Sequence, residues 1–172
     1  VVQCTSCAGA PDPCSSITTL VCANSVTAAL TGPGLWSPGS CGFSTPGTEK
    51  IYSFTAAATG VHTLQVTSTS STGFIDYFYK AASGGCNATG WTCIDDIFSP
   101  ATATIGTLTA GTTYYILLDP ETPSAVSHTF MINCPAAFDP CTTIPILTSA
   151  TAGAATSSGT GAASPNRCGS TT

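Results

Sequence analysis

The stretch Leu108-Thr109-Ala110-Gly111-Thr112-Thr113-Tyr114-Tyr115-Ile116-Leu117-Leu118-Asp119 decides the fold class of this 172-residue chain. Ala110-Gly111 is a turn signal, and the run after it is rich in aromatic and β-branched residues that favour strands. Elsewhere apolar side chains recur every second residue, as on one face of a strand, and sustained helical spacing is absent. These pairs are Tyr52 and Phe54, Leu64 and Val66, Tyr77 and Tyr79, and Phe130 and Ile132. Short strands separated by turn signals predict an all-β sandwich.

The stretch from Lys50 to Val66 has an aromatic strand, a Thr-Gly turn and an apolar strand in succession. Together with Leu108 to Asp119, it resembles bacterial pre-peptidase C-terminal-type domains of large secreted proteins, over about residues 12–134. The resemblance implies a jelly-roll-like antiparallel β-sandwich and no catalytic role for the module itself.

An internal repeat organises the chain at an offset of 127 residues. Residues 8–45 match residues 135–172 at 15 of 38 positions, and Asp12-Pro13-Cys14 returns as Asp139-Pro140-Cys141. A repeat of this length corresponds to a whole domain, because the repeats of solenoid proteins are much shorter. We therefore expect an N-terminal strand over 1–7 that resembles the end of a preceding repeat, a disulfide-stapled sandwich over 8–134, and an extended partial repeat over 135–172.

Ten cysteines in so short a chain indicate an oxidising compartment, outside the cytoplasm. Six cysteines of the full unit allow 15 pairings. Because Cys14 and Cys41 are copied together as Cys141 and Cys168, we expect each of these two pairs to be bonded. A short loop favours Cys86 with Cys93. The remaining cysteines would then form Cys22–Cys134 and Cys4–Cys7.

Charge excludes two classes of partner. The net charge is −5, with only three basic residues, so no cationic surface is expected to neutralise phosphates or anionic lipids. No apolar run is long enough to cross a membrane. We expect neither nucleic acid binding nor membrane insertion.

The sequence shows no arrangement of residues that is typical of a catalytic site. His62 and His128 are in phase with inward-facing strand residues, so we expect them at the rim of the core rather than beside a nucleophile. No pair of carboxylates is identifiable as a glycosidase acid and base. We expect a protein that is not an enzyme and has no cofactor except, as one alternative, calcium. The candidate oxygen ligands are Asp76, Asp95, Asp96 and Asp119, with solvated loop carboxylates as the other interpretation.

Asn87-Ala88-Thr89 fits the N-glycosylation acceptor pattern in an exposed loop, which predicts an attached glycan at Asn87.

Two functions follow. The first is an extracellular or cell-surface structural subunit whose copies join head-to-tail by strand addition. The assembly residues would be Val1 and Val2 at one end and Thr142, Ile144, Ile146 and Leu147 at the other. The alternative is a carbohydrate-binding or adhesive module of a larger secreted protein, in which Trp36, Trp91 and tyrosines stack on sugars; the competing interpretation is that these aromatics fill the sandwich.

Overall fold

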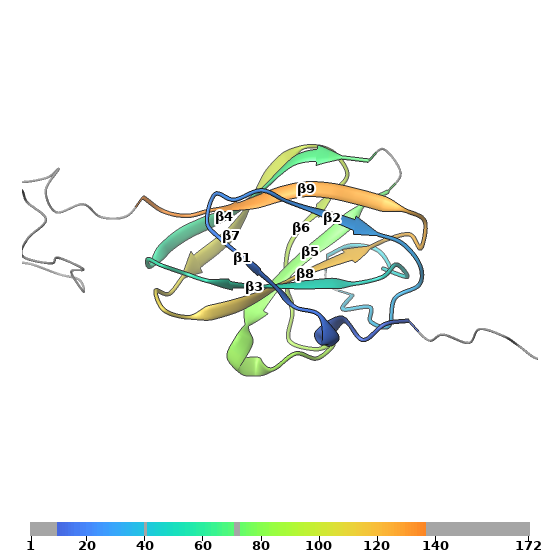
Figure 1. Ribbon diagram of the computed structural model, residues 1–172, viewed down its shortest axis with the longest axis horizontal. Helices are drawn as coiled ribbons and strands as arrows, with labels where there is room; N and C mark the ends of the chain where they lie inside the picture. Colours follow the sequence, from blue (N-terminus) through green and yellow to red (C-terminus); the bar gives the residue numbers. More distant parts are fainter. Residues whose placement is uncertain (1–9, 40, 71–72, 137–172) are drawn as a thin grey trace, which may run out of the picture. The chain divides into compact units, whose positions relative to one another are not determined.

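The computed structural model describes residues 10–39, 41–70 and 73–136. Within them the chain forms two sheets packed face to face, with only two short 3-10 helices (Figure 1). The elements are η1 Pro13–Ser15, β1 Thr18–Leu20, β2 Val26–Leu30, β3 Lys50–Thr55, β4 Gly60–Thr69, β5 Ile75–Ala81, η2 Ala82–Gly84, β6 Thr92–Ile97, β7 Ala101–Leu108, β8 Thr113–Pro120 and β9 Val126–Asn133. The predicted disulfide-stapled sandwich is confirmed, whereas the partial repeat at 135–172 lies almost wholly outside the described residues.

Five strands form one sheet in the order β1-β3-β8-β5-β6, and four form the other in the order β2-β9-β4-β7. All neighbouring pairs are antiparallel except β1 with β3, which run parallel. Strands β1 and β2 follow each other along the chain but belong to different sheets, so they form the free edges on one side of the sandwich.

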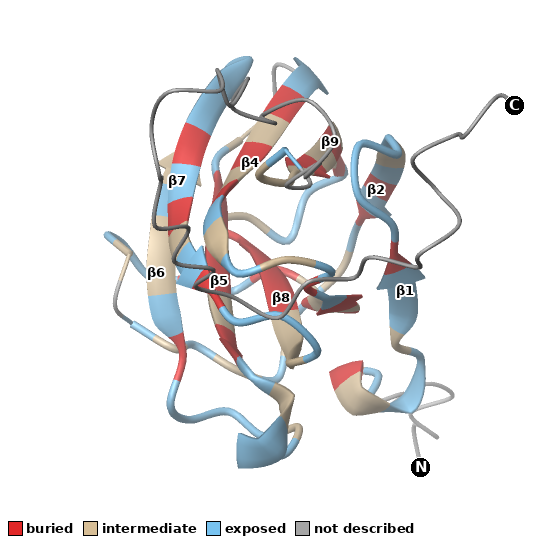
Figure 2. Cartoon of the chain, turned by 90° about the vertical axis from the view of Figure 1, so that its left-hand side faces the viewer, coloured by how far each residue is buried: buried red, intermediate tan, exposed pale blue. Residues whose placement is uncertain are grey.

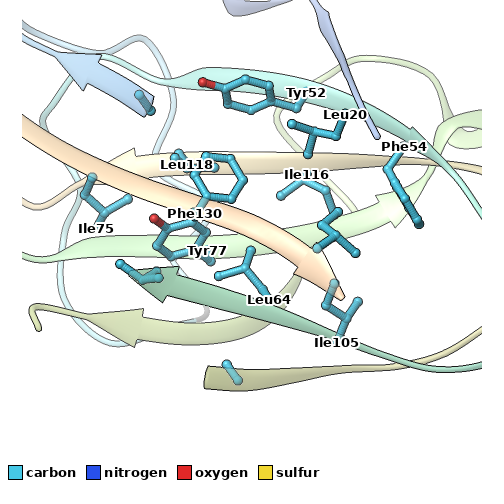
Figure 3. Packing of buried hydrophobic residues seen from close by; sticks show 14 of the residues in the cluster. Leu20, Tyr52, Phe54, Leu64, Ile75, Tyr77, Ile105, Ile116, Leu118 and Phe130 are labelled. Carbon is cyan, nitrogen blue, oxygen red and sulfur yellow. The ribbon is translucent and has the colours of Figure 1, made fainter. Parts of the chain in front are cut away.

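Alternation of burial along the strands builds the core. In β9 every second side chain is buried, and β7 shows the same alternation (Figure 2). Because successive side chains of a strand point to opposite faces, the apolar set of each sheet gathers on one side. Figure 3 shows Leu64 and Phe130 of the four-stranded sheet among Tyr77, Ile116 and Leu118 of the five-stranded sheet.

Aromatic edge-to-face contacts hold this layer together. The ring of Phe130 lies 5.4 Å from Tyr52 and 5.7 Å from Tyr77, at interplanar angles of 78° and 70°. Such pairs stabilise a core beyond their area burial by about 0.5–1.5 kcal/mol each. The residues expected on inward faces from period-2 spacing are buried here, apart from the partly buried Tyr79.

A second apolar cluster lies on the other face of the five-stranded sheet. Ile51, Phe78, Trp91 and Leu117 are buried in it. Its cover includes η1 and the long connection from Thr31 to Glu49, because Cys14, Trp36 and Cys41 pack against the cluster. The outer face of this sheet is therefore also a site of burial, and the polar side chains that share it are described next.

Candidate functional site

Three aspartates form a row across the outer face of the five-stranded sheet. Asp76 of β5 is paired in register with Asp96 of β6 on one side and with Asp119 of β8 on the other. Residues directly opposite each other in a ladder point to the same face. Asp76 alternates with Ile75 and Tyr77 of the main core, so the row shares the face of the second apolar cluster.

Glu121 completes the acidic group from just beyond β8. Its backbone N–H donates to the carbonyl of Phe74, two residue pairs beyond the row. Oxygens of Asp76, Asp96 and Glu121 all lie within 4.8 Å of one another, and we call these three residues the carboxylate triad. Asp76 is the buried member, while Asp96 and Glu121 are half-buried and face the surface.

Burial and mutual repulsion both disfavour ionisation here. Burial, the charges of Asp96 and Glu121, and a side-chain hydrogen bond with Asp96 raise the pKa of Asp76 to about 8. Burial also raises the pKa of Asp96 and that of Glu121, and a backbone hydrogen bond from Phe43 partly opposes the rise at Glu121. The two basic residues in the described part of the chain do not compensate this charge, since Lys50 donates to Ser16 and Lys80 donates to Asn87 and Thr89.

Asp119 lies beside the triad in the fully buried part of the row. Its Oδ2 accepts a 2.8 Å hydrogen bond from the hydroxyl of Thr45, and its Oδ1 has no hydrogen-bond partner. Burial raises the pKa of Asp119 to about 8, the Thr45 hydrogen bond lowers it, and the charges of Glu49 and Asp76 raise it further.

Of the four aspartates proposed from the sequence as calcium ligands, the structure brings Asp76 and Asp96 into one cluster with Glu121. Asp119 is the register neighbour of Asp76 but is not one of the clustered oxygens. Asp95 is exposed and precedes Asp96 in β6, so it points to the other face of the strand. Glu121 was missed, although its two-residue spacing from Asp119 was a usable signal.

The connection from Thr31 to Glu49 crosses the acidic row. A Cβ at Gly42 would lie 3.7 Å from Oδ2 of Asp96, and Gly47 donates to the carbonyl of Pro120 at 3.0 Å. Glu49, itself buried, accepts a hydrogen bond from the backbone N–H of Trp36. The disulfide Cys41–Cys93 fastens the connection to β6. The loop thus lies over the carboxylates instead of leaving them on an open sheet.

The disulfides correct two of the predicted pairings. The structure bonds Cys14 to Cys86 and Cys41 to Cys93, instead of Cys14 to Cys41 and Cys86 to Cys93. The prediction Cys22–Cys134 is confirmed. Three disulfides in one domain are typical of proteins from an oxidising compartment outside the cytoplasm.

The exchange of partners has a physical reason. All four cysteines pack around the second apolar cluster, so Cys14 and Cys41 lie in the same region without being bonded to each other. The loop between Cys86 and Cys93 is closed by Lys80, whose Nζ donates to the carbonyls of Asn87 and Thr89 at 3.0 Å each. This leaves both cysteines of that loop free to anchor η1 and the Thr31–Glu49 connection.

The remaining sequence-based sites divide between described and undescribed parts of the chain. Asn87 is exposed, and its Oδ1 accepts from the N–H and hydroxyl of Thr89, each at 3.1 Å. Several predicted residues lie outside the described ranges, so their pairing and assembly roles stay predictions. They are Val1, Val2, Cys4, Cys7, Cys141, Thr142, Ile144, Ile146, Leu147 and Cys168.

Both histidines lie in the interior, as their strand phase predicts. His62 and His128 are fully buried. Nδ1 of His62 donates to the carbonyl of Gly60 at 2.9 Å, and Nδ1 of His128 lies 3.0 Å from the hydroxyl of Tyr77. Burial lowers the pKa of His128 to about 4. Neither ring is placed to activate a surface nucleophile.

The tryptophans proposed for sugar stacking pack inward. Trp91 is buried, and Trp36, half-buried, lies 6.4 Å from it between ring centroids. The large aromatic side chains exposed in the described residues are instead phenylalanines. Phe74 and Phe98 lie 4.9 Å apart at the edge of the triad, and Phe43 is 75% exposed.

Comparison with known proteins gives a likeness of fold. No family model matches the chain, and no curated protein matches it. Among solved structures, the chain is similar to the pre-peptidase C-terminal domain of collagenase from Bacillus anthracis, with 10% identity and a TM-score of 0.48. The match covers 69% of this chain and 95% of that domain. That domain is of the type that the sequence resembles.

None of the helices in the described residues is long and apolar enough to span a membrane.

Proposed function

We propose that this chain is a non-catalytic structural module of an extracellular or cell-surface assembly, in which copies join head-to-tail by strand addition. The observation that carries the proposal is the path of the chain through the sandwich. The described part begins beside η1 at one end and leaves β9 at the opposite end (Figure 1). A module entered and left at opposite ends can be strung in line with others.

A free edge beside an apolar hollow supports strand addition. Among the described strands β2 pairs with β9 alone, so within that part of the chain the other edge of β2 offers unpaired backbone groups. Where β2 pairs with β9, Ala29, Leu30 and Val126 line a shallow and mainly apolar hollow. An added strand gains affinity from main-chain hydrogen bonds, and a side chain seated in such a hollow sets its register. Ile144 or Ile146 would supply that side chain.

The interior also favours a structural role. The buried rings of His62 and His128 and the inward tryptophans serve packing, and three disulfides join distant parts of the chain. Head-to-tail contacts that do not close on themselves extend into filaments. The product of assembly would be a fibre or a comparable surface structure.

The test compares fibre formation by the full chain with that of the double variant Ile144→Asp, Ile146→Asp, by electron microscopy. Two charges on one face of the added strand should abolish fibres, because neither can enter an apolar hollow. The matched control is Ser157→Asp, Ser158→Asp, which adds the same charge outside the proposed strand.

A second variant tests the acceptor edge. Ala29→Pro removes a backbone donor from β2, and fibres should be lost although the disulfides of the purified monomer are intact. Fibres that persist in the aspartate variant would refute strand addition through this segment. If the control Ser157→Asp, Ser158→Asp also lost its fibres, strand addition through this segment would be refuted too, since added charge alone would then be the cause.

A further inference from the structure

The buried member of the carboxylate triad is Asp76. Asp76 is 1% exposed, yet its Oδ1 has no hydrogen-bond partner, and it lies among carboxylate oxygens of Asp96 and Glu121. A buried carboxyl ionises readily only where a positive charge compensates it. Oδ1 of Asp96 and Oε1 of Glu121 are also buried and without hydrogen-bond partners.

The separation and chemistry of these oxygens are compatible with calcium. Oxygens bound to the same calcium ion lie about 2.4 Å from it, so two of them can be up to about 4.8 Å apart. The oxygens of the triad all lie within 4.8 Å of one another. Magnesium binds at about 2.0–2.1 Å and demands tighter octahedral geometry. Zinc prefers nitrogen and sulfur ligands, and every cysteine in the described residues is in a disulfide.

We infer that Asp76, Asp96 and Glu121 bind a calcium ion on the outer face of the five-stranded sheet. The three carboxylates supply from three to six oxygens, and water completes the usual six to eight. Asp76 forms the buried floor of the site, and half-buried Asp96 and Glu121 lie beside it. The inference does not depend on head-to-tail assembly.

Calcium here would join separate segments of the chain. Asp76, Asp96 and Glu121 come from β5, β6 and the end of β8, and the Phe43 amide of the overlying connection hydrogen bonds to Glu121. One ion therefore links three neighbouring strand ends and indirectly the loop over them. A site of this kind converts repulsion between like charges into attraction.

The experiment is calorimetric titration of chelator-treated full-length protein with calcium chloride, together with its thermal unfolding midpoint. We expect one site per chain and a midpoint that rises with calcium. The variants Glu121→Gln and Asp96→Asn should each weaken calcium binding at least tenfold. In chelator, both should unfold at the wild-type temperature or above it, since each removes a negative charge from the cluster. That readout shows that the variants are folded.

The matched control is Asp95→Asn. Asp95 is exposed, precedes Asp96 and points to the other face, so this variant should bind calcium within twofold of wild type. The inference is overturned if the wild type shows neither binding nor a shifted midpoint at millimolar calcium. Equal loss of binding in Asp95→Asn and Asp96→Asn would overturn it too, and so would an equal response to magnesium at the same concentration.

Discussion

The ammonium group of Lys80, in β5, lies 4.5 Å from the ring centroid of Trp91. It also hydrogen bonds to oxygens of the loop that leads to Trp91. Nζ donates to the carbonyls of Asn87 and Thr89 and to Oδ1 of Asn87, and the indole N–H of Trp91 donates to the same Asn87 carbonyl at 2.9 Å. One buried cation thus organises the loop between the two cysteines that anchor the N-terminal segments.

Replacing Lys80 by Met should therefore lower the free energy of unfolding by about 2 kcal/mol, because hydrogen bonds to charged groups contribute about 1.5–3 kcal/mol. Met keeps the apolar stem against Trp91 but removes the charged donor from the Asn87 and Thr89 carbonyls, of which the Asn87 carbonyl keeps only the indole N–H of Trp91. Chemical denaturation followed by tryptophan fluorescence measures the change. The control is Lys50→Met, which removes two hydrogen bonds to Ser16 but is only half-buried. If Lys80→Met lowered the free energy of unfolding no more than Lys50→Met does, the stabilising role given to Lys80 would be contradicted.

Peptide mapping without reduction should recover Cys14–Cys86, Cys41–Cys93 and Cys22–Cys134. Replacing Cys41 and Cys93 together by Ser should destabilise the fold by about 4 kcal/mol, the chain-entropy value for a loop of 52 residues. Urea unfolding measures it. Recovery of a Cys14–Cys41 peptide would refute the observed connectivity.

Acid should destabilise the protein through His128. The folded state keeps this ring neutral down to about pH 4, whereas the unfolded chain protonates it near pH 6.5. Between these values unfolding takes up a proton, so stability falls as pH falls, by up to about 1.4 kcal/mol per pH unit. Above pH 6.5 the ring is neutral in both states and contributes no slope.

The measurement is the free energy of unfolding of wild type minus that of His128→Gln, from pH 4 to 7.5. Gln can still hydrogen bond to the hydroxyl of Tyr77 but does not titrate, so the difference isolates the histidine from the carboxyls. A difference that is constant across this range would contradict the prediction.

Asn87 should carry a glycan when the chain is secreted from a host with N-glycosylation, because the side chain is exposed in its acceptor sequence. Thr89→Ala should lose the glycan, whereas Thr89→Ser, which keeps the hydroxyl, should retain it; intact mass, corrected for the substitution, measures this. An unmodified wild-type chain from such a host would refute the prediction.

The sequence predicted the parts of the structure that follow from strand periodicity. The alternation of apolar and polar residues around Leu64 and Phe130 predicted that both side chains lie in the core. The same alternation predicted that the side chain of His128 points inward. The partners of Cys14 and Cys41 could not be found this way, because they depend on how the Thr31–Glu49 connection folds across the sheet, and no periodicity encodes that path. Asp76 and Asp96 were recognised as acids but not as register partners. Their meeting depends on the pairing of β5 with β6, which includes a bulge between Tyr77 and Phe78.

The disulfide Cys22–Cys134 also has a mechanical consequence. The module is entered at one end and left at the other, so tension along a string of such modules would pull on residues near both ends (Figure 1). The bond spans 112 residues of sequence, and about 380 Å of contour length is therefore shielded from extension. Under load the sandwich can lengthen only by its short flanking segments. A linear array of such modules would therefore resist extension until the disulfides are reduced.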